Sequence, residues 1–471
     1  MIRFFLITIL TIVSNVIFAQ SAIERNYPRT LWATNDSFAV KFSNLPTFAP
    51  SFRVSEQDTV DAGTDGEMGS HAIVYFGNDS IRINYNNVPL DEVTWINIHS
   101  PKGKTVYRFH FNSYNVAFSP KYIQTNTNRI QLEVPEVYEL ANIIWTISPS
   151  GRRADNLNKH GDYYKKVSKY FKPYLNHPLF KKLDFKGDSY MSNYYDFREN
   201  SFAYSFDGKN KLGWGQPYFY VNGNDRNFNS LFKELIPLIE DFAQESNYRA
   251  FYKSNLSYYQ QLIKEEFELM PIKKMWQWLE NNFPTKFDSY KVVFSPLINA
   301  SHSTQNFSSS LDGKWFMETV MFVSGPTIFY NDKQLNKRQK EGLASGIVFT
   351  EIDHNYVNPE SSKFNAAIDS IFSKRQVWTS SIGDTKFYNS PETVFNEYMT
   401  HAVFCLYVLD TFDAETADFI IKRRGSLMVE HRGYIKFREF NKKLIEVHNL
   451  NKQSKTSDLF LKIIGWCKTQ V

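Results

Sequence analysis

The hydrophobic pattern of this chain changes its period at Pro135, and this change sets the fold class. Before Pro135, short runs such as His71–Phe76 and 105–111 alternate apolar and polar residues, as half-buried strands do. After it, Glu136–Ile147 carries apolar residues at steps of three and four, which is typical of a helix. The chain is therefore predicted to be α+β, with an all-β, sandwich-like module over 20–134 and a mainly helical domain over 135–471.

Further segments after Pro135 repeat the helical period or the alternation of strands. Two expected strands, 290–297 and 315–323, lie on either side of a Ser- and Asn-rich stretch at 299–310 and predict a small antiparallel sheet. The other expected helices cover 163–175, 228–243, 249–270, 274–282 and 337–358.

Residues 1–20 have the pattern of a secretory signal. Arg3 forms the basic region, 4–13 form the apolar core, and Ala19 is the small residue after which cleavage is predicted, so that the signal covers 1–19. The apolar run is short for a membrane span. The mature protein is therefore expected to be secreted or periplasmic, with no stable insertion in a membrane.

Charge and cysteine content exclude some classes of partner and scaffold. The chain has 54 Lys and Arg against 49 Asp and Glu, without a basic cluster, so no nucleic acid is expected as a partner. Cys405 and Cys467 are its two cysteines, so disulfides are not the framework of the fold. Cys405 lies in an apolar helical run and is interpreted as a core residue. Whether the two cysteines pair stays open, and so does the oligomeric state.

A carboxylate and an imidazole lie one turn apart near the end of the expected helix 337–358, which Pro359 is expected to stop. The frame of Thr350, Glu351 and His354 differs by one residue from H-E-x-x-H, where two histidines bind zinc and the glutamate is the general base. Thr350 stands where the first histidine would be, and a hydroxyl is a poor substitute for imidazole on zinc. The alternative interpretation is a helix end with an ordinary hydrogen-bonded histidine.

A second helix with the same chemistry is predicted to begin at Ser390 and Pro391, with Ser390 as its cap. Glu397 and His401 lie one turn apart on a face of this helix that is otherwise apolar. Such groups are costly to bury unless something pairs or ligates them. They form an internal pair that braces the core, or they face Glu351 and His354 across one site.

The two helices, with short stretches elsewhere, resemble the secreted bacterial family called DUF4932, whose members look like zincin metallopeptidases. The resemblance implies a zincin-like fold for 135–471, a bound zinc ion, and a peptide or protein as substrate. Carried over by position, Glu351 would be the base, and His354 and Glu397 would be two zinc ligands. The stretches that carry the resemblance are 134–140 (VPEVYEL), 163–167 (YYKKV), 170–171 (YF), 177–178 (HP), 295–297 (SPL), 354–359 (HNYVNP) and 396–397 (NE).

Thr350 departs from the family pattern, and an exchange with His401 would restore a third zinc ligand. In the zincins with a glutamate ligand, the residue four after that glutamate is commonly an aspartate that orients the first zinc histidine. Here that position holds His401, which would reach into the ligand position that Thr350 leaves. His354, Glu397, His401 and a water would then surround the ion. Further candidate site residues are His302 and Asp353 as ligands and Tyr356 as a stabiliser of the oxyanion.

Three functions are compatible with these residues. The first is an exported zincin-like metallopeptidase in which a zinc-activated water attacks the peptide bond and Glu351 is the base. The second is a zincin scaffold without metal that acts as a binding protein, which Thr350 favours. The third is a glycan-acting hydrolase that uses Glu351 and Glu397 as a pair of carboxylates.

Overall fold

The computed structural model describes residues 118–471 apart from short gaps, together with Val116 and the backbone of strands between Tyr27 and Phe109. The gaps are 188, 216, 219–220, 222–229, 312–313, 326–328, 330–331, 381–382 and 452–453. The predicted signal, 1–19, lies outside the described residues. Among the helices described, none is both long and apolar enough to cross a membrane.

The chain divides into two compact units. The first unit comprises Met1–Thr125, Met191–Pro237 and Phe307–Phe316. The second unit comprises Asn126–Tyr190, Leu238–Asn306 and Met317–Val471, and it contains all of the predicted site residues. The described residues are mostly helical, with a small mixed sheet that lies mainly in the second unit. The segment Phe307–Phe316, which includes the end of β15 and the start of β16, is assigned to the first unit.

The strands before residue 110 form three sheets, which are described for their backbone. The largest has the order β3-β2-β7-β6-β5, a second has the order β10-β9-β4, and β1 pairs with β8. A further hairpin of β12 (Tyr204–Phe206) and β13 (Leu212–Trp214) belongs to the first unit, as does helix α7 (Leu231–Glu234). Most of helix α6 (Ser189–Asn200) also lies there. The strand bounds are β1 (Tyr27–Pro28), β2 (Leu31–Asn35), β3 (Phe38–Phe42), β4 (Ser51–Arg53), β5 (Val60–Asp61), β6 (His71–Phe76), β7 (Asp79–Tyr85), β8 (Leu90–Glu92), β9 (Thr94–Ser100) and β10 (Gly103–Phe109).

The sheet of the second unit has the strand order β11-β14-β16-β15. Strand β14 (Ser289–Ser295) runs parallel to β11 (Arg129–Glu133) and to β16 (Lys314–Ser324). Strand β15 (Ser303–Leu311) lies at the edge, and two residues connect it to β16, so these two strands run antiparallel.

The prediction of a small antiparallel sheet was therefore wrong, because the sheet is mixed. Strand β15 lies largely within the Ser- and Asn-rich stretch at 299–310 and was not predicted. An edge strand can carry polar side chains because its surface stays half exposed. Strand β11, which covers most of the stretch 129–134 that was assigned to the N-terminal module, pairs with β14. More than 150 residues of largely helical chain separate these two strands, and a parallel pair needs such a crossover.

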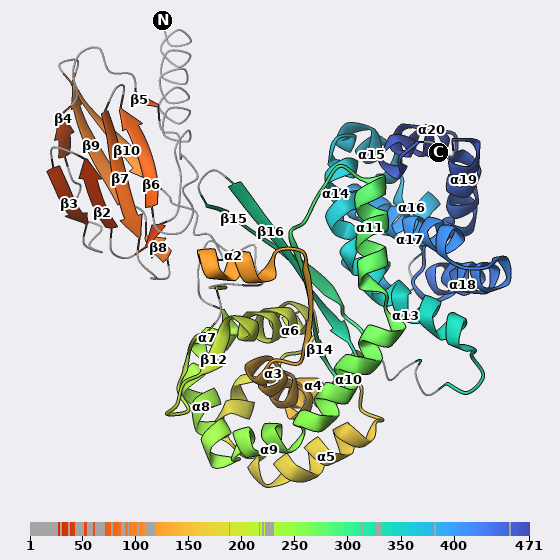
Figure 1. The fold of residues 1–471 in the computed structure, drawn as a ribbon, viewed down its shortest axis with the longest axis horizontal. Coiled ribbons are helices and arrows are strands. Elements are labelled where there is room, and N and C mark those ends of the chain that lie inside the picture. Colours follow the sequence, from red (N-terminus) through yellow and green to blue (C-terminus); the bar gives the residue numbers. More distant parts are fainter. Residues whose placement is uncertain are drawn as a thin grey trace, which may run out of the picture. The chain divides into compact units, whose positions relative to one another are not determined.

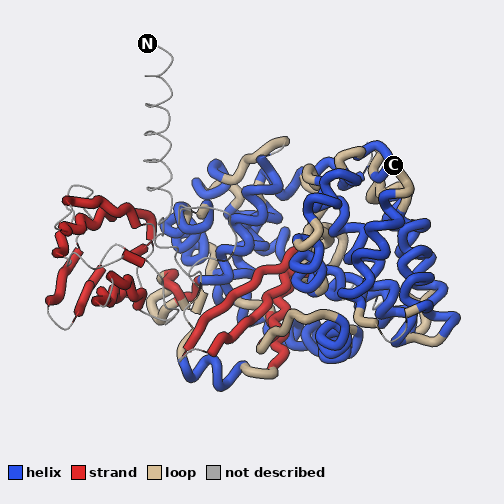
Figure 2. Tube along the Cα trace, turned by 90° about the horizontal axis from the view of Figure 1, so that it is seen from above, coloured by secondary structure: helices blue, strands red, loops and turns tan. Residues whose placement is uncertain are grey.

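Helices cover both faces of this sheet (Figures 1 and 2). On one face, Phe322 of β16 packs against Tyr138 of α3, with ring centroids 5.5 Å apart. On the other face, Tyr290 of β14 packs against Trp276 of α11 at 4.1 Å and forms a hydrogen bond with Tyr356 of α14. Since successive side chains of a strand point to opposite faces, the parallel strands anchor both helical layers.

The helices that were predicted in the second unit lie close to their predicted places, and α3 has the predicted ends. No helix was predicted where α4, α18, α19 and α20 lie. Helix α2 (Pro120–Asn126) precedes them, mostly in the first unit. The bounds are α3 (Glu136–Ile147), α4 (Pro149–Arg153), α5 (Asp162–Phe171), α8 (Ile236–Glu245), α9 (Tyr248–Ser254), α10 (Leu256–Leu269), α11 (Ile272–Asn282), α13 (Lys337–Ile352), α14 (His354–Ser362), α15 (Asn365–Phe372), α16 (Arg375–Trp378), α17 (Pro391–Thr411), α18 (Ala414–Ser426), α19 (Phe437–Leu450) and α20 (Phe460–Lys468).

The expected helix 337–358 consists of two helices that meet at Asp353. Helix α14 begins at His354 and continues through Pro359 to Ser362, so the prediction that Pro359 stops the helix was wrong. Proline removes one backbone hydrogen bond from a helix interior. The buried face of α14, which includes Tyr356 and Val357, offsets this loss by packing in the core.

Candidate functional site

Helices α14 and α17 bring two of the predicted site residues together. His354 Nε2 lies 3.3 Å from Glu397 Oε1, and both residues belong to the second unit. Ser390 caps α17 by accepting from the backbone N–H of Thr393, as predicted. Asn355, next to His354, donates to Thr304 of β15 at 3.0 Å and to Thr319 of β16 at 2.8 Å, which fixes the start of α14 on the sheet.

His354 is held as an imidazolium between two acceptors. Its Nδ1 lies 3.3 Å from Asn358 Oδ1, so Nδ1 carries a proton, and Nε2 faces the carboxylate of Glu397. Burial alone would lower the pKa of His354. The hydrogen bond and charge of Glu397, with the charges of Glu351 and Asp353, outweigh burial and raise this pKa to about 9. The ring is therefore protonated at neutral pH.

Glu397 is a buried carboxylate with cations on both oxygens. Its Oε2 lies 2.8 Å from Arg432 Nη2, and its Oε1 faces His354. Burial raises the pKa of Glu397, but Arg432, His354 and His401 lower it further and hold it well below its usual range. Glu397 therefore stays ionised throughout the neutral range.

His401 lies between two guanidinium groups. Its Nδ1 is 2.9 Å from Arg424 Nη1, its Nε2 is hydrogen-bonded to Arg432 Nη1, and its Nε2 lies 3.6 Å from Glu397 Oε2. Burial and both arginines lower the pKa of His401 to about 3, although Glu397 opposes them. The ring is neutral and has one lone pair, and in either tautomer that lone pair faces a guanidinium N–H.

The two arginines are fixed by their own contacts. Arg432 follows the π-helical turn η5 (Leu427–His431), and its Nη2 lies 3.0 Å from Tyr388 Oη. Arg424 of α18 is half-buried, donates to Gly346 O at 3.1 Å and covers the ring of Phe404. Burial, with the nearby Arg432, lowers the pKa of Arg424 to about 10, so this group is still cationic at neutral pH.

The remaining residues of the first motif do not complete a ligand set. Thr350 Oγ1 donates to Gly346 O at 2.9 Å, within its own helix. Asp353 is fully buried, and neither of its carboxyl oxygens has a hydrogen-bond partner among the described residues. Burial raises the pKa of Asp353 well above its usual value. Glu351 is half-buried, and its charge acts on both His354 and Asp353.

Two predicted candidates lie elsewhere in the second unit. Tyr356 is fully buried, where its hydroxyl meets Tyr290 and its ring packs against Phe283 and Phe287. Its hydroxyl is therefore directed to the core beneath the sheet and is not placed to stabilise an oxyanion. His302 precedes β15, and its Nε2 lies 3.2 Å from Ser324 Oγ of β16.

The donor set around Glu397 fits zinc only in part. Two ligands about 2.1 Å from a tetrahedral ion lie about 3.4 Å apart, which matches His354 Nε2 and Glu397 Oε1. A zinc histidine commonly donates its other ring N–H, as His354 does to Asn358. A third protein ligand is not formed, because His401 faces two guanidinium groups and Thr350 donates to its own helix. The residues present therefore do not fit a catalytic zinc site.

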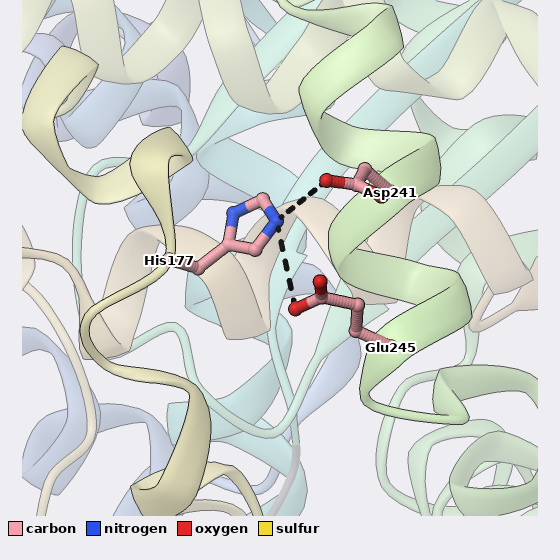
Figure 3. A group of neighbouring side chains, drawn as sticks. All are labelled: His177, Asp241 and Glu245. Atoms are coloured by element: carbon pink, nitrogen blue, oxygen red, sulfur yellow. Dashed lines mark hydrogen bonds and ion pairs between the residues drawn. The ribbon is translucent and has the colours of Figure 1, made fainter.

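A second group of metal-binding residue types consists of His177, Asp241 and Glu245 (Figure 3). In the described part of the chain, this is the one group of three such side chains whose ligand atoms all lie within 4.8 Å of one another. His177 precedes the short 3₁₀ helix η2 (Pro178–Lys182), and the two carboxylates lie one turn apart on α8. Sequence reasoning missed this group because helix α8 brings the carboxylates to a distant histidine.

The tautomer of His177 decides what this group does. His177 Nδ1 accepts from the backbone N–H of Leu179 at 3.2 Å, so the ring proton of the neutral imidazole is on Nε2. This N–H points to Asp241 Oδ2 at 3.2 Å, with Glu245 Oε2 at 4.0 Å. A metal would need the Nε2 lone pair, which the proton occupies. The group is therefore a hydrogen-bonded helix cap that ties η2 to α8.

Comparisons with family models, with curated proteins and with solved structures found no match.

Proposed function

We propose that this chain is an exported, zincin-like scaffold that does not use a catalytic zinc and acts as a binding protein for peptide segments. The observation that carries the proposal is the place of His401 between Arg424 and Arg432. If His401 replaced Thr350 as the third zinc ligand, its imidazole would need a free lone pair. The neutral ring of His401 has one lone pair, and the guanidinium groups of Arg424 and Arg432 compete for it. The predicted signal peptide and the sandwich-like N-terminal module are part of this proposal.

The fixed charges of the site support binding rather than metal-assisted hydrolysis. Arg432 supplies a permanent positive charge beside Glu397, which is the place where a divalent ion would be most stabilised. His354 adds a second positive charge, and its side chain is 22% exposed, so a ligand can reach it. These groups form a polar recognition site whose charges do not depend on metal supply.

The position of β15 suggests an extended peptide as the ligand. This strand is the edge of the sheet, and an extended peptide can add to a sheet edge through its main chain. Asn355 receives a hydrogen bond from Asn306 of β15 at 2.8 Å, so this edge is tied to the helix that begins at His354. A peptide that lies along Thr304 to Asn306 would run beside the charged site.

Metal content and hydrolysis test this proposal together. The purified mature protein is expected to hold no stoichiometric zinc and to leave casein intact. Binding of fluorescein-labelled casein, followed by anisotropy, is expected to survive Glu351→Gln, because that change removes a general base but keeps the site's shape. One zinc per chain, with casein cleavage that Glu351→Gln abolishes, would refute the proposal.

The second candidate is a zinc peptidase with Glu351 as base, as the family resemblance implies. The distance of 3.3 Å between His354 Nε2 and Glu397 Oε1 favours it, since two zinc ligands have this spacing. The glycan-acting alternative fits less well. A glycosidase needs an ionised carboxylate that can act on the sugar or on a water, whereas His354 and Arg432 already pair with the two oxygens of Glu397.

A further inference from the structure

Arg432 lies more than 30 residues after Glu397 in the sequence and pairs with this buried carboxylate. Its Nη2 lies 2.8 Å from Glu397 Oε2 and 3.0 Å from Tyr388 Oη. Its guanidinium carbon lies 5.7 Å from the ring of Tyr388 and 5.5 Å from that of Tyr434. The side chain is 16% exposed, and the Glu397 side chain is 5% exposed. A cation in such surroundings is held by charge and by two aromatic faces at once.

We propose that Arg432 is the built-in cation of this site: beside Glu397, its guanidinium supplies the positive charge that a divalent metal ion would otherwise supply, and its removal turns the site into a metal site. This inference rests on the proposed function, in which the unmodified protein holds no zinc there. Glu397 and His354 supply the two donors that remain, and the ring of His401 loses one of its two guanidinium neighbours.

The physical reason is that Glu397 must be matched by positive charge. A buried carboxylate that loses its partner costs several kcal/mol. Without Arg432, the remaining partner is His354, which can release its Nε2 proton to water and bind a metal ion through the Nε2 lone pair. A divalent ion between His354 Nε2 and Glu397 would then restore the balance, with water as further ligands.

The test compares unmodified protein with Arg432→Met, which keeps much of the side-chain volume and removes the charge. Zinc binding at equilibrium with added zinc and the rise of the melting temperature with added zinc are measured on both. Arg432→Met is expected to bind one zinc per chain at saturation, weakly because two protein ligands hold it, and to gain stability with zinc, since a ligand that binds the folded state stabilises it. Arg438→Met is the matched control, because Arg438 is an exposed arginine that pairs with Glu430.

The outcomes separate this inference from the proposed function. Stoichiometric zinc in the unmodified protein that Glu397→Gln removes refutes the proposed function. A folded Arg432→Met protein that binds no more zinc than the Arg438→Met control refutes the inference alone.

A double-mutant cycle covers the case in which Arg432→Met folds poorly. Arg432→Met combined with Glu397→Gln removes both charges, so the double variant is expected to be more stable than Arg432→Met alone. Strictly additive losses of stability would show that the two residues are not coupled, and would overturn the inference without any metal measurement.

Discussion

His354 Nε2 lies 3.3 Å from Glu397 Oε1, and this pair joins the first turn of α14 to the middle of α17. The same distance suits an ion pair and two ligands of one tetrahedral zinc. The residues around the pair distinguish an ion pair from a zinc site. Arg432 faces the other oxygen of Glu397, so the carboxylate already has two cationic partners.

A third histidine donor is expected to improve metal binding once Arg432 is gone. Thr350→His in the Arg432→Met background would add an imidazole near His354, so zinc should bind more tightly than in Arg432→Met alone. The gain is expected because a three-ligand site is far better for zinc than a two-ligand site. Isothermal titration with zinc measures it.

The matched control for this prediction is Lys337→His in the same background, because Lys337 is exposed at the start of the same helix. Equal affinities of the Thr350→His and Lys337→His proteins would mean that α13 and α14, which meet at Asp353, do not bring residue 350 to the site.

Gly346 is expected to be essential for the position of Arg424. A Cβ at Gly346 would lie 2.0 Å from Arg424 Nη2 and 2.9 Å from an atom of the Phe404 ring. Arg424 would have to move, which breaks its hydrogen bond to Gly346 O and the contact with His401. Gly346→Ala is therefore expected to lower the free energy of unfolding by about 2–3 kcal/mol, measured by denaturant unfolding.

Gly465 of α20 provides the control, because a Cβ there meets nothing within 4 Å. Gly465→Ala is expected to change stability by less than about 1 kcal/mol and in the stabilising direction, since alanine favours the helix. A Gly346→Ala protein as stable as this control would show that Arg424 is not tightly packed against α13.

The helices that carry this site were easier to predict from the sequence than the tertiary contacts between them. Helix α3 and the Ser390 cap of α17 follow from local periodicity and spacing, which a single segment carries. The approach of His354 to Glu397 was instead implied by the family resemblance and suggested by the similar chemistry of the two helices. Arg424 and Arg432 had no such signal. Arg424 is the second of two adjacent arginines near the end of α18, and Arg432 follows a π-helical turn. Only tertiary packing brings them to His401.

The sheet was mispredicted for a related physical reason. Parallel pairing between β11 and β14 depends on a long crossover and leaves no mark in either strand. The edge strand β15 is polar, so its composition resembled that of a loop. Proline usually ends a helix, which is why Pro359 was predicted to stop this one. The packing of the buried residues of α14 stabilises the helix by more than the one lost hydrogen bond costs.

Glu139 is expected to make the stability of the protein depend on pH. It is fully buried on α3, where its Oε1 accepts from Tyr163 Oη at 2.6 Å. Burial raises its pKa from 4.5 to about 8, although hydrogen bonds from Tyr163 and Ser295 oppose this. The folded state thus binds the proton more tightly than the unfolded state. Its contribution to stability is complete below about pH 4.5 and is lost as the pH rises to about 8, by up to about 4–5 kcal/mol.

Glu139→Gln removes this titration and still accepts a hydrogen bond from Tyr163. Its free energy of unfolding is expected to stay flatter than that of the unmodified protein between pH 5 and pH 8. Glu136→Gln is the control, because Glu136 is on the same helix and pairs with Arg249 near the surface. If unmodified protein and Glu139→Gln lose stability in parallel over this range, Glu139 is not the group that titrates.

The group of His177, Asp241 and Glu245 is expected to act as a helix cap and not as a metal site. His177→Ala removes the acceptor for the N–H of Leu179 and should lower the free energy of unfolding by about 1 kcal/mol, as the loss of an N-cap does. His177→Asn should recover part of this, since asparagine caps helices well.

Added zinc should leave the melting temperature of the unmodified protein unchanged. A rise with zinc that His177→Ala and Asp241→Asn both abolish would mean that the ion displaces the Nε2 proton, and the tautomer argument would then be wrong. A rise that survives His177→Ala and disappears in Glu397→Gln would place the ion at the other site and count against the proposed absence of zinc there.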